Sequence, residues 1–310
     1  MTSLKKKVMH SKFVRSVFSA LSYDRDLFYF YLNPKRSAEL NFTSIYNRKI
    51  NWENPRHIEE KFHWMQFNTD TSLWTRCADK YAVRDYVIEH GCGNILNKLY
   101  GRWDDARDID FDKLPDKFVI KTNNASGTVI IVENKNALNI NKTVKKLNYW
   151  LRRRYGIIGG QIHYLKIKPC IIAEEYLSDP SQDGLNDYKC FCFKGEVDSI
   201  KVCSNRVIPS ASYENHEYSN TIYSTSWERL DASIQTKIVD IPKPLSLSEM
   251  IGACRALGEG IPFVRIDFYE VCGKLYFGEM TFTPGLENET FEFGLHLGGK
   301  LHLEELKTVR

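Results

Sequence analysis

The chain has 310 residues, a length that favours about two domains and easily supports a buried core. Its 43 basic and 39 acidic residues nearly balance, which argues against a protein that coats nucleic acid, because such a protein needs a clustered basic excess. The eight cysteines form no C-x-x-C pair and no zinc-type spacing, so we expect free thiols in a reducing compartment. The sequence contains no run of 18 apolar residues, so no membrane span is predicted.

The N-terminal segment is basic and then amphipathic. Lys5 to Lys7 precede apolar residues at helical spacing between Phe13 and Leu21, while Arg15 and the charged run Asp24 to Asp26 make a poor secretory signal. Such a helix either lies on an anionic membrane surface or packs on its own domain. We therefore expect a cytoplasmic protein, held at the inner membrane face under the first alternative, with no nucleic-acid partner.

Residues 1 to about 110 are predicted to be mainly helical. The clearest helical periodicity lies in 52–61 and 78–90, and glycines at 91 and 93 end the second stretch. Near Pro115 the pattern changes to short β-branched runs that alternate loosely with helices, which indicates an α+β fold. The elements expected beyond this change are strands at 118–121, 128–132 and 170–177, helices at 141–154 and 247–257, a hairpin of 187–193 with 199–203, and a loop-rich stretch at 204–245.

A second hairpin is predicted over 263–281, with its turn centred at Gly273. Asp267 then faces Glu279 and Arg265 faces Thr281, and all four side chains share one face of the sheet. Two like charges in direct opposition are destabilising, so a bound cation is expected to offset the repulsion. Carboxylates together with substrate phosphates are the usual ligands of Mg²⁺. The alternative is that Arg265 merely neutralises two acids on a solvated face.

Lys121 ends a predicted strand and precedes a loop of small and polar residues that contains Asn124, Ser126 and Gly127. Small residues let backbone amides approach a phosphate closely, and a neighbouring lysine supplies a point charge. The spacing differs from that of a P-loop. The loop is therefore either a phosphate-binding loop or an ordinary hairpin turn beside a surface lysine.

Two further segments could hold a nucleotide. The run Glu174, Glu175, Tyr176 and Leu177 at a strand end offers apolar groups and edge hydrogen bonds of the kind that adenine needs, or it is a solvated strand terminus. Asp187 and Lys189 share one face of a strand, where an acid suits a ribose hydroxyl and a lysine suits phosphate. A structural ion pair is the alternative for this second pair.

Asp108 and Asp110 form an Asp-x-Asp pair of the type that holds a metal in nucleotide-sugar glycosyltransferases. The pair lies in an acidic stretch of residues 104–112, where charges are usually solvated. The chain contains no nucleophile elbow, no H-E-x-x-H and no Rossmann fingerprint.

The order of these segments resembles the TupA-like ATP-grasp proteins of bacterial surface-polysaccharide loci, members of the ATP-grasp superfamily. The resemblance extends from about Asn51 to Gly299. Its most similar segments are 78–87 (ADKYAVRDYV), 103–121, Asp187 to Lys189, Phe263 to Asp267, and 278–285 (GEMTFTPG).

The resemblance implies an ATP-grasp fold that holds ATP between two α+β subdomains, with an N-terminal helical region at 1–112, a small lid subdomain at 113–178 and a C-terminal subdomain with the Mg-ATP site at 179–310. Many ATP-grasp ligases carry asparagine where this chain has Thr281, which puts a second metal ion in doubt. The implied roles are phosphate binding by Lys121 and Lys189, a closing loop from Asn124 through Ser126 to Gly127, an adenine hinge of Glu174, Glu175, Tyr176 and Leu177, ribose contact by Asp187, Mg²⁺ ligation by Asp267, Glu279 and Thr281, and stabilisation of the transferring phosphoryl group by Arg265.

The resemblance further implies an ATP- and Mg²⁺-dependent ligase that joins a carboxylate to an amine through an acyl phosphate. A uronic acid of a surface glycan and an amino acid or small amine are the expected partners. Residues 204–226, with Arg206, His216, Tyr218 and Tyr223, are expected to contact the acceptor, and Arg206 is a candidate catalytic residue. A glycosyltransferase, a kinase-like phosphotransferase and a non-catalytic nucleotide-binding protein remain as alternatives.

Overall fold

The computed structural model describes residues 27–179, 184–204, 219–234 and 239–309. The predicted amphipathic helix before Asp26, together with Arg206, His216 and Tyr218, therefore lies outside the described residues. Within the described ranges, no helix is both long and apolar enough to cross a bilayer.

The N-terminal region is helical, as predicted, but its helix limits differ from those expected. The stretch 52–61 is helical only from Ile58, since Pro55 disfavours helical backbone before it and His57 forms a capping box with Glu60. The stretch 78–90 is interrupted, because Asp79 accepts hydrogen bonds from the amides of residues 81 and 82 and so forms a turn between two helices. The helices of this region include α3 Pro34–Tyr46, α4 Ile58–Asn68, α5 Ser72–Ala78 and α6 Val83–Glu89.

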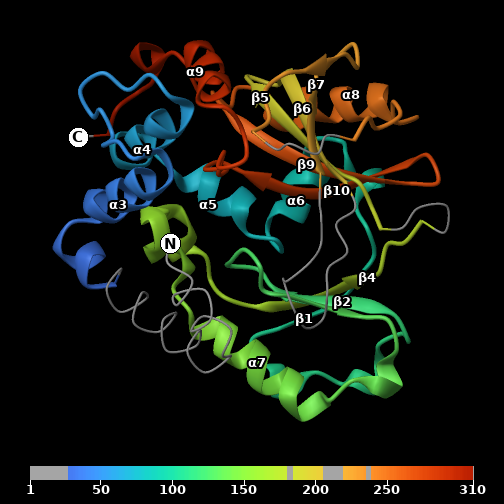
Figure 1. The fold of residues 1–310 in the computed structure, drawn as a ribbon. Helices are drawn as coiled ribbons and strands as arrows, with labels where there is room; N and C mark the ends of the chain where they lie inside the picture. Colours follow the sequence, from blue (N-terminus) through green and yellow to red (C-terminus); the bar gives the residue numbers. More distant parts are fainter. Residues whose placement is uncertain (1–26, 180–183, 205–218, 235–238, 310) are drawn as a thin grey trace, which may run out of the picture.

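A four-stranded antiparallel sheet forms the lower layer of the molecule in Figure 1, with strand order β1-β4-β2-β3. Its strands are β1 Leu99–Trp103, β2 Phe118–Thr122, β3 Val129–Val132 and β4 Ile171–Glu175. Helix α7 (Ile140–Arg152) covers one face of this sheet, and its Leu147 and Trp150 pack in one cluster with Phe118 and Ile120. β1 joins this sheet from within the region predicted as 1–112, and the domain division itself remains a prediction.

A six-stranded antiparallel sheet forms the second layer, with strand order β10-β9-β5-β6-β7-β8. The predicted hairpin around Gly195 and the predicted helix closed by Gly258 are both present. The strands are β5 Asp187–Phe193, β6 Glu196–Ser204, β7 Ser219–Tyr223, β8 Arg229–Leu230, β9 Val264–Val271 and β10 Lys274–Thr281. Helices α8 (Leu247–Gly258) and α9 (Phe291–Lys300) complete this half, and the largest hydrophobic cluster joins α8, α9 and the N-terminal helices to the sheet.

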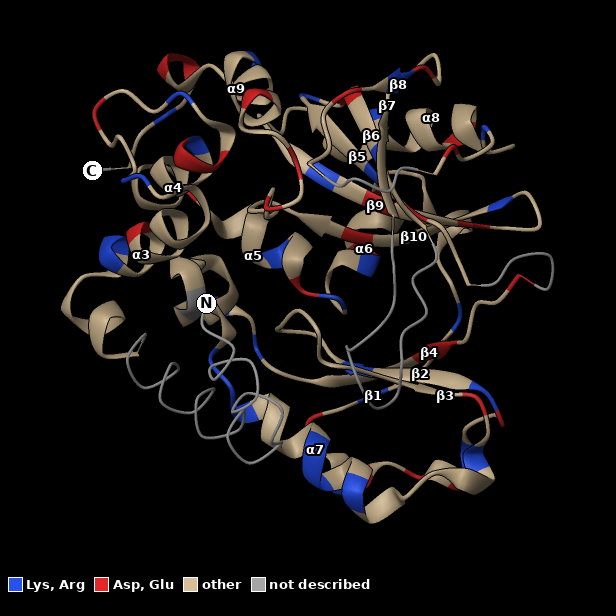
Figure 2. Ribbon diagram, in the orientation of Figure 1, with Lys and Arg blue, Asp and Glu red and all other residues tan. Residues whose placement is uncertain are grey.

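The predicted α+β class with a helical N-terminal region is therefore confirmed. The helical region lies beside the six-stranded sheet, and the four-stranded sheet, which is covered by α7, forms a separate layer (Figure 1). Figure 2 shows acidic positions on β9 and β10 on the side of the molecule where the two sheets approach each other. All eight cysteines carry free thiols, as expected.

Candidate active site

The β9–β10 hairpin sets the geometry of the site. Its two-residue turn, Cys272 and Gly273, pairs Val271 with Lys274, and the same register continues to the pair of Phe268 with Phe277. The register then shifts by one residue, so that Asp267 faces Glu279. The predicted pairing is therefore correct, although the turn is centred between residues 272 and 273 rather than at Gly273.

Gly278 is the residue at which this register shift occurs. A Cβ atom there would lie 2.9 Å from the carbonyl oxygen of Asp267 and 3.3 Å from the Tyr269 ring. Only glycine fits such a close backbone approach, which is typical of a β-bulge. Without the shift, Asp267 would face Gly278 and Glu279 would point to the other side of the sheet.

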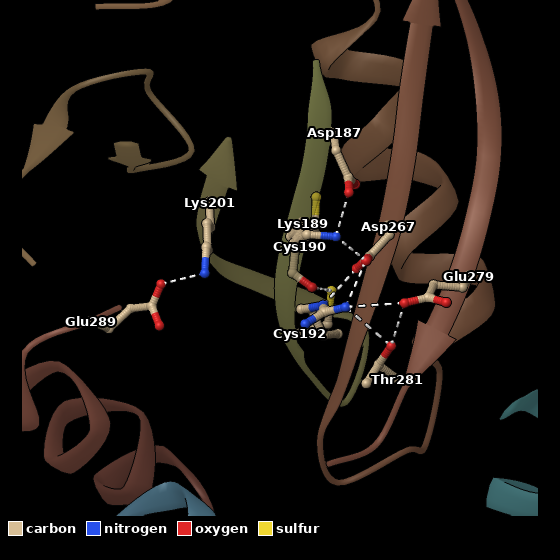
Figure 3. Close-up of polar contacts among 10 residues, drawn as sticks. Asp187, Lys189, Cys190, Cys192, Lys201, Asp267, Glu279, Thr281 and Glu289 are labelled. Atoms are coloured by element: carbon tan, nitrogen blue, oxygen red, sulfur yellow. Dashed lines mark hydrogen bonds and ion pairs between the residues drawn. The ribbon is translucent and has the colours of Figure 1, made fainter. Parts of the chain in front are cut away.

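Arg265 holds the acidic face of the hairpin together. Figure 3 shows Asp267, Glu279 and Thr281 side by side on this face. Its Nε and Nη2 donate to the two oxygens of Asp267, each at 2.7 Å. Nη2 also lies 3.2 Å from Glu279 Oε1 and 3.2 Å from the Thr281 hydroxyl. The structure therefore brings together all four residues predicted to share this face.

Strand β5 adds a second cation to the cluster. Lys189 lies directly opposite Asp267 in the sheet, with Nζ 2.5 Å from Asp267 Oδ2 and 2.6 Å from Asp187 Oδ2. Asp267 and Asp187 are each only 2% exposed. Asp267 therefore does not lie on a solvated face, and the ion pair expected as the alternative for Asp187 and Lys189 is present as part of a buried ionic network.

The electrostatics of the cluster keep its acids ionised. Burial alone would raise the pKa of Glu279, but the nearby Lys80 and Arg265 lower it to about 2. Burial likewise opposes the charge of Arg265, yet Asp267 and Glu279 hold its pKa above the ordinary value. The side chain of Glu279 is 39% exposed, so part of it faces solvent while its charge lies beside Arg265.

The predicted phosphate and adenine residues of the four-stranded sheet are also brought together. Lys121 Nζ lies 2.5 Å from Glu174 Oε2, and Arg84 of α6 lies 3.5 Å from Glu174 Oε1. Tyr176 donates to Glu133, and Glu175 accepts a bond from the amide of Lys98. Leu177 is half-buried beyond the strand end.

The loop after β2 is partly packed and partly exposed. Asn124 is buried, Ser126 is exposed, and Gly127 has a φ of 72°, which is the left-handed region that favours glycine. Asn123 anchors the loop, because its side chain bonds the Asp79 carboxylate at 2.8 Å and the carbonyl of Lys168 at 3.0 Å.

Lys80 is a site residue that the sequence reasoning missed. Its Nζ donates to the Ala125 carbonyl at 2.8 Å, and its charge acts on Glu279 of the opposite sheet. The motif 78–87 belonged to the family resemblance, but helical periodicity placed Lys80 within a continuous surface helix. The turn after α5 instead directs it between the loop and the hairpin.

Two tyrosines from irregular helices complete the surroundings of Glu279. Tyr155 lies in η5 (Tyr155–Gly160) and Tyr164 in η6 (Ile162–Lys166). Burial raises the pKa of Tyr155, and the charges of Glu279 and Glu287 act in the same direction. Burial and Glu279 also raise the pKa of Tyr164. Neither segment has a periodic pattern, so no sequence signal pointed to them.

Two earlier alternatives lose support from the structure. Asp108 and Asp110 are both exposed, and Asp110 accepts from the Asp112 amide and pairs with Lys113, which is the role of a helix cap. Tyr223, expected in an acceptor loop, is instead buried in β7, where its ring stacks on Trp227 at 4.4 Å. That expectation was wrong because the loop-rich stretch contains a strand.

Within the described ranges, no group of three or more His, Cys, Asp or Glu side chains is arranged to hold a metal ion. The hairpin offers two carboxylates and one hydroxyl, which suits a cation that completes its shell with water and phosphate oxygens.

Solved structures of ligases are among those similar to this chain. A D-alanine–D-alanine ligase from Bacillus anthracis complexed with ATP is similar, with 15% identity, a TM-score of 0.46, and coverage of 75% of this chain and 64% of that one. An L-amino acid ligase from Bacillus licheniformis has 16% identity and a TM-score of 0.45, with 74% and 49% covered. This chain thus spans less than two thirds of the length of either protein.

No curated protein matches this chain. The model of the TupA-like ATPgrasp family matches residues 60–301, a range that includes both sheets and all the described candidate site residues. The chain therefore belongs to the TupA-like ATPgrasp family.

Proposed function

We propose that the protein is an ATP- and Mg²⁺-dependent ligase that joins a carboxylate to an amine. The observation that carries this proposal is the ionic cluster of the β9–β10 hairpin, in which Arg265 bonds Asp267, Glu279 and Thr281 at once. Membership of the ATP-grasp family supports the same function.

The donor set of the cluster fits Mg²⁺ and a triphosphate. Asp267, Glu279 and Thr281 would hold the metal ion, which when bound supplies positive charge to the transferring phosphate. Four cations would bind the phosphates. Arg265 and Lys189 contact the acids of the hairpin, the charge of Lys80 acts on Glu279, and Lys121 is paired with Glu174 of the four-stranded sheet. Before ATP arrives, the same cations neutralise Asp267, Glu279 and Glu174, so the acids are held ready without repelling one another.

The other residues predicted from the sequence to bind ATP have the same roles in this proposal. Glu174 to Leu177 would contact adenine, Asp187 the ribose, and the loop from Asn124 to Gly127 would cover the phosphates. Arg206 lies outside the described residues and stays a predicted acceptor or catalytic residue.

The reaction needs no nucleophile from the protein. A substrate carboxylate attacks the γ-phosphorus of ATP, a P–O bond breaks, and ADP and an acyl phosphate form. The amine nitrogen then attacks the acyl carbon, the C–O bond to phosphate breaks, and the amide and phosphate are released. Of the two protons that an ammonium substrate loses, one leaves on the phosphate and one goes to solvent. Arg265 and Lys189 act by positioning and by neutralising charge on the phosphoryl group.

The family context supports a uronic acid of a bacterial surface polysaccharide as the carboxylate and an amino acid or small amine as its partner. It also supports a cytoplasmic location. The basic N-terminal segment would either contact the inner membrane face or pack on its own domain, as the sequence predicts.

A kinase-like phosphotransferase is the second candidate, because the same cations would serve transfer to a hydroxyl. A glycosyltransferase is not favoured, because Asp110, one of the two acids predicted to hold its metal ion, is exposed and caps a short helix. One assay separates these functions, in which the protein is mixed with Mg²⁺, ATP, glucuronic acid or galacturonic acid, and hydroxylamine. ADP with a hydroxamate supports the ligase. ADP with a stable phosphorylated sugar would contradict it and favour the kinase.

A further inference from the structure

A cavity of about 350 Å³ lies next to the ionic cluster, and none of the roles above uses it. Its walls come from α3, α4, the start of η6 and the segment that directly continues β10. The lining residues that matter here are Glu59, His63, Gln161, Thr283 and Glu287. The volume is at the lower end of the range for ligand sites, which suits a small molecule.

The cavity is close to the reacting groups. Thr283 follows Thr281 by two residues, so their backbones are within roughly 7 Å of each other even when fully extended. Tyr155 connects the two places, because the charges of Glu279 in the cluster and of Glu287 in the cavity wall both act on its hydroxyl. A ligand in the cavity would therefore lie close to the hairpin residues that are proposed to hold the metal ion.

The charge of the wall is negative. Glu59 and Glu287 are its only acids in the part of the chain that is described, and burial keeps His63 neutral by lowering its pKa to about 4. Burial also raises the pKa of Glu59 to about 7, so Glu287 supplies the charge of the wall at neutral pH and Glu59 becomes fully ionised only beside a cation. Glu59 is only 4% exposed, and the partners described for it are the Tyr46 hydroxyl at 2.9 Å and the Leu286 amide at 2.7 Å, both neutral donors. The neighbouring Glu289, in contrast, is paired with Lys201 at 2.5 Å.

The wall also holds an unused polar atom. Thr283 is 8% exposed, and its hydroxyl is buried without a hydrogen-bond partner among the described residues. A buried hydroxyl without a partner costs free energy, so this atom is explained if a ligand completes it.

We propose that this cavity is the site of the amine substrate, and that it binds a small primary ammonium group between Glu59 and Glu287. This inference rests on the proposed ligase function, to which it adds the location and charge of the second substrate. A carboxylate would be repelled by Glu287, and a neutral sugar would leave the buried Glu59 without a counter-charge. An ammonium group provides that charge, and its remaining hydrogens can reach Thr283 and the Gln161 amide oxygen.

The test compares Glu59→Gln and Glu287→Gln with Glu292→Gln, an exposed acid of α9 outside the cavity. The probes are glycine, L-alanine, L-serine, L-lysine and ethanolamine, each with its N-acetyl form as the uncharged partner. Hydroxamate formation reports the acyl phosphate and needs no ammonium recognition. Calorimetry with each probe and the MgADP-bound protein reports binding without turnover.

We expect at least one probe to bind wild type while its N-acetyl form does not. In Glu59→Gln and Glu287→Gln, the ratio of amine-dependent rate to hydroxamate rate should fall at least ~10-fold, the loss expected for one hydrogen bond to a charged group. Glu292→Gln should match wild type in both measurements. Because Glu287 is exposed, its variant tests the idea even if Glu59→Gln does not fold.

Two results would overturn the assignment while leaving the ligase intact. These are an unchanged rate ratio in both variants, and N-acetyl probes that bind as well as the free amines. Probe binding that depends on Glu59 and Glu287, in a protein that makes no hydroxamate, would instead keep the cation site and remove the ligase function.

Discussion

The pKa values of two acids of this molecule, Glu279 and Glu59, are shifted in opposite directions. Glu279 on β10 has cations on both sides, Lys80 and Arg265, which hold its pKa at about 2. Among the described residues, the donors to Glu59 on α4 are all neutral, and burial, reinforced by Glu287 and Glu289, raises its pKa to about 7. Burial penalises both carboxylates, so the difference comes from the counter-charges that the fold supplies.

This comparison separates two kinds of site. Where the fold surrounds acids with cations, the place is prepared for a polyanion with its metal ion, such as a nucleoside triphosphate. Where the fold buries an acid without a cation, the place is prepared for a ligand that carries the positive charge itself. The cavity beside the hairpin is of this second kind.

The largest effect is expected at the cation-rich site. Glu279→Gln keeps the shape of the side chain but removes its charge, and turnover should fall at least ~10²-fold, the range seen for loss of one key electrostatic group. The measurement is ADP release at saturating ATP, with Glu292→Gln as the matched control. Near wild-type turnover in a correctly folded Glu279→Gln protein would reject the metal assignment.

Lys80 tests whether the missed cation belongs to the phosphate site. Lys80→Met removes the bond to the Ala125 carbonyl and one of the charges that act on Glu279. The value of kcat/KM for ATP should fall at least ~10-fold, as for loss of a charge-assisted hydrogen bond. Lys142→Met, at an exposed position of α7, is the control and should behave as wild type. An equal response of the two variants would exclude Lys80 from the site.

The register of the hairpin is tested by Gly278→Ala. The new Cβ would lie 2.9 Å from the Asp267 carbonyl oxygen, so the backbone must shift, and we expect a loss of about 1–3 kcal/mol in the free energy of unfolding. ADP release should fall as well, since the strands no longer align Asp267 with Glu279. Gly252→Ala in α8, where nothing lies within 4 Å, should be neutral or stabilising. Full stability and activity of Gly278→Ala would show that the bulge is dispensable.

The smallest effect concerns the cation-poor site, through the pH dependence of stability. The pKa of Glu59 is raised from 4.5 to about 7, so between these values the folded protein binds a proton that the unfolded chain has released. The stabilisation from this group is therefore present at low pH and is lost as pH rises to about 7.

Glu59→Gln cannot titrate, so the unfolding free energy of wild type minus that of the variant should decrease from pH 5 to pH 8, by at least about 1.4 kcal/mol, the equivalent of one pKa unit. Urea denaturation at both pH values measures it. The buried His57, His63 and His163 titrate in both proteins and cancel in the difference. A pH-independent difference would contradict the raised pKa of Glu59.

Local patterns predicted the elements that carry most of the candidate site. Alternation of β-branched residues gave the strands of both hairpins, and Asp267 and Glu279 were paired correctly. The pairing was correct for an incomplete reason, because the turn lies half a residue earlier than expected and the bulge at Gly278 restores the alignment. A bulge depends on the fit of two backbones, which single-strand alternation does not encode.

The residues that were missed have a common cause. Lys80, Tyr155 and Tyr164 lie on a turn and two irregular helices, where no period of 2 or 3.6 residues marks a buried face. Asp79 interrupts the predicted helix at 78–90 by capping, so the direction of Lys80 is set by a side chain rather than by periodicity.

By itself, the sequence determined the α+β class, the family and the strand face that carries Arg265, Asp267 and Glu279, because alternation and turn chemistry are local properties. Only the tertiary structure decided which charges meet across the sheets. The charge of Lys80 acts on Glu279, and Glu59 has no cation partner among the described residues, because segments far apart in the chain pack together, and counter-charges in a folded protein depend on that packing.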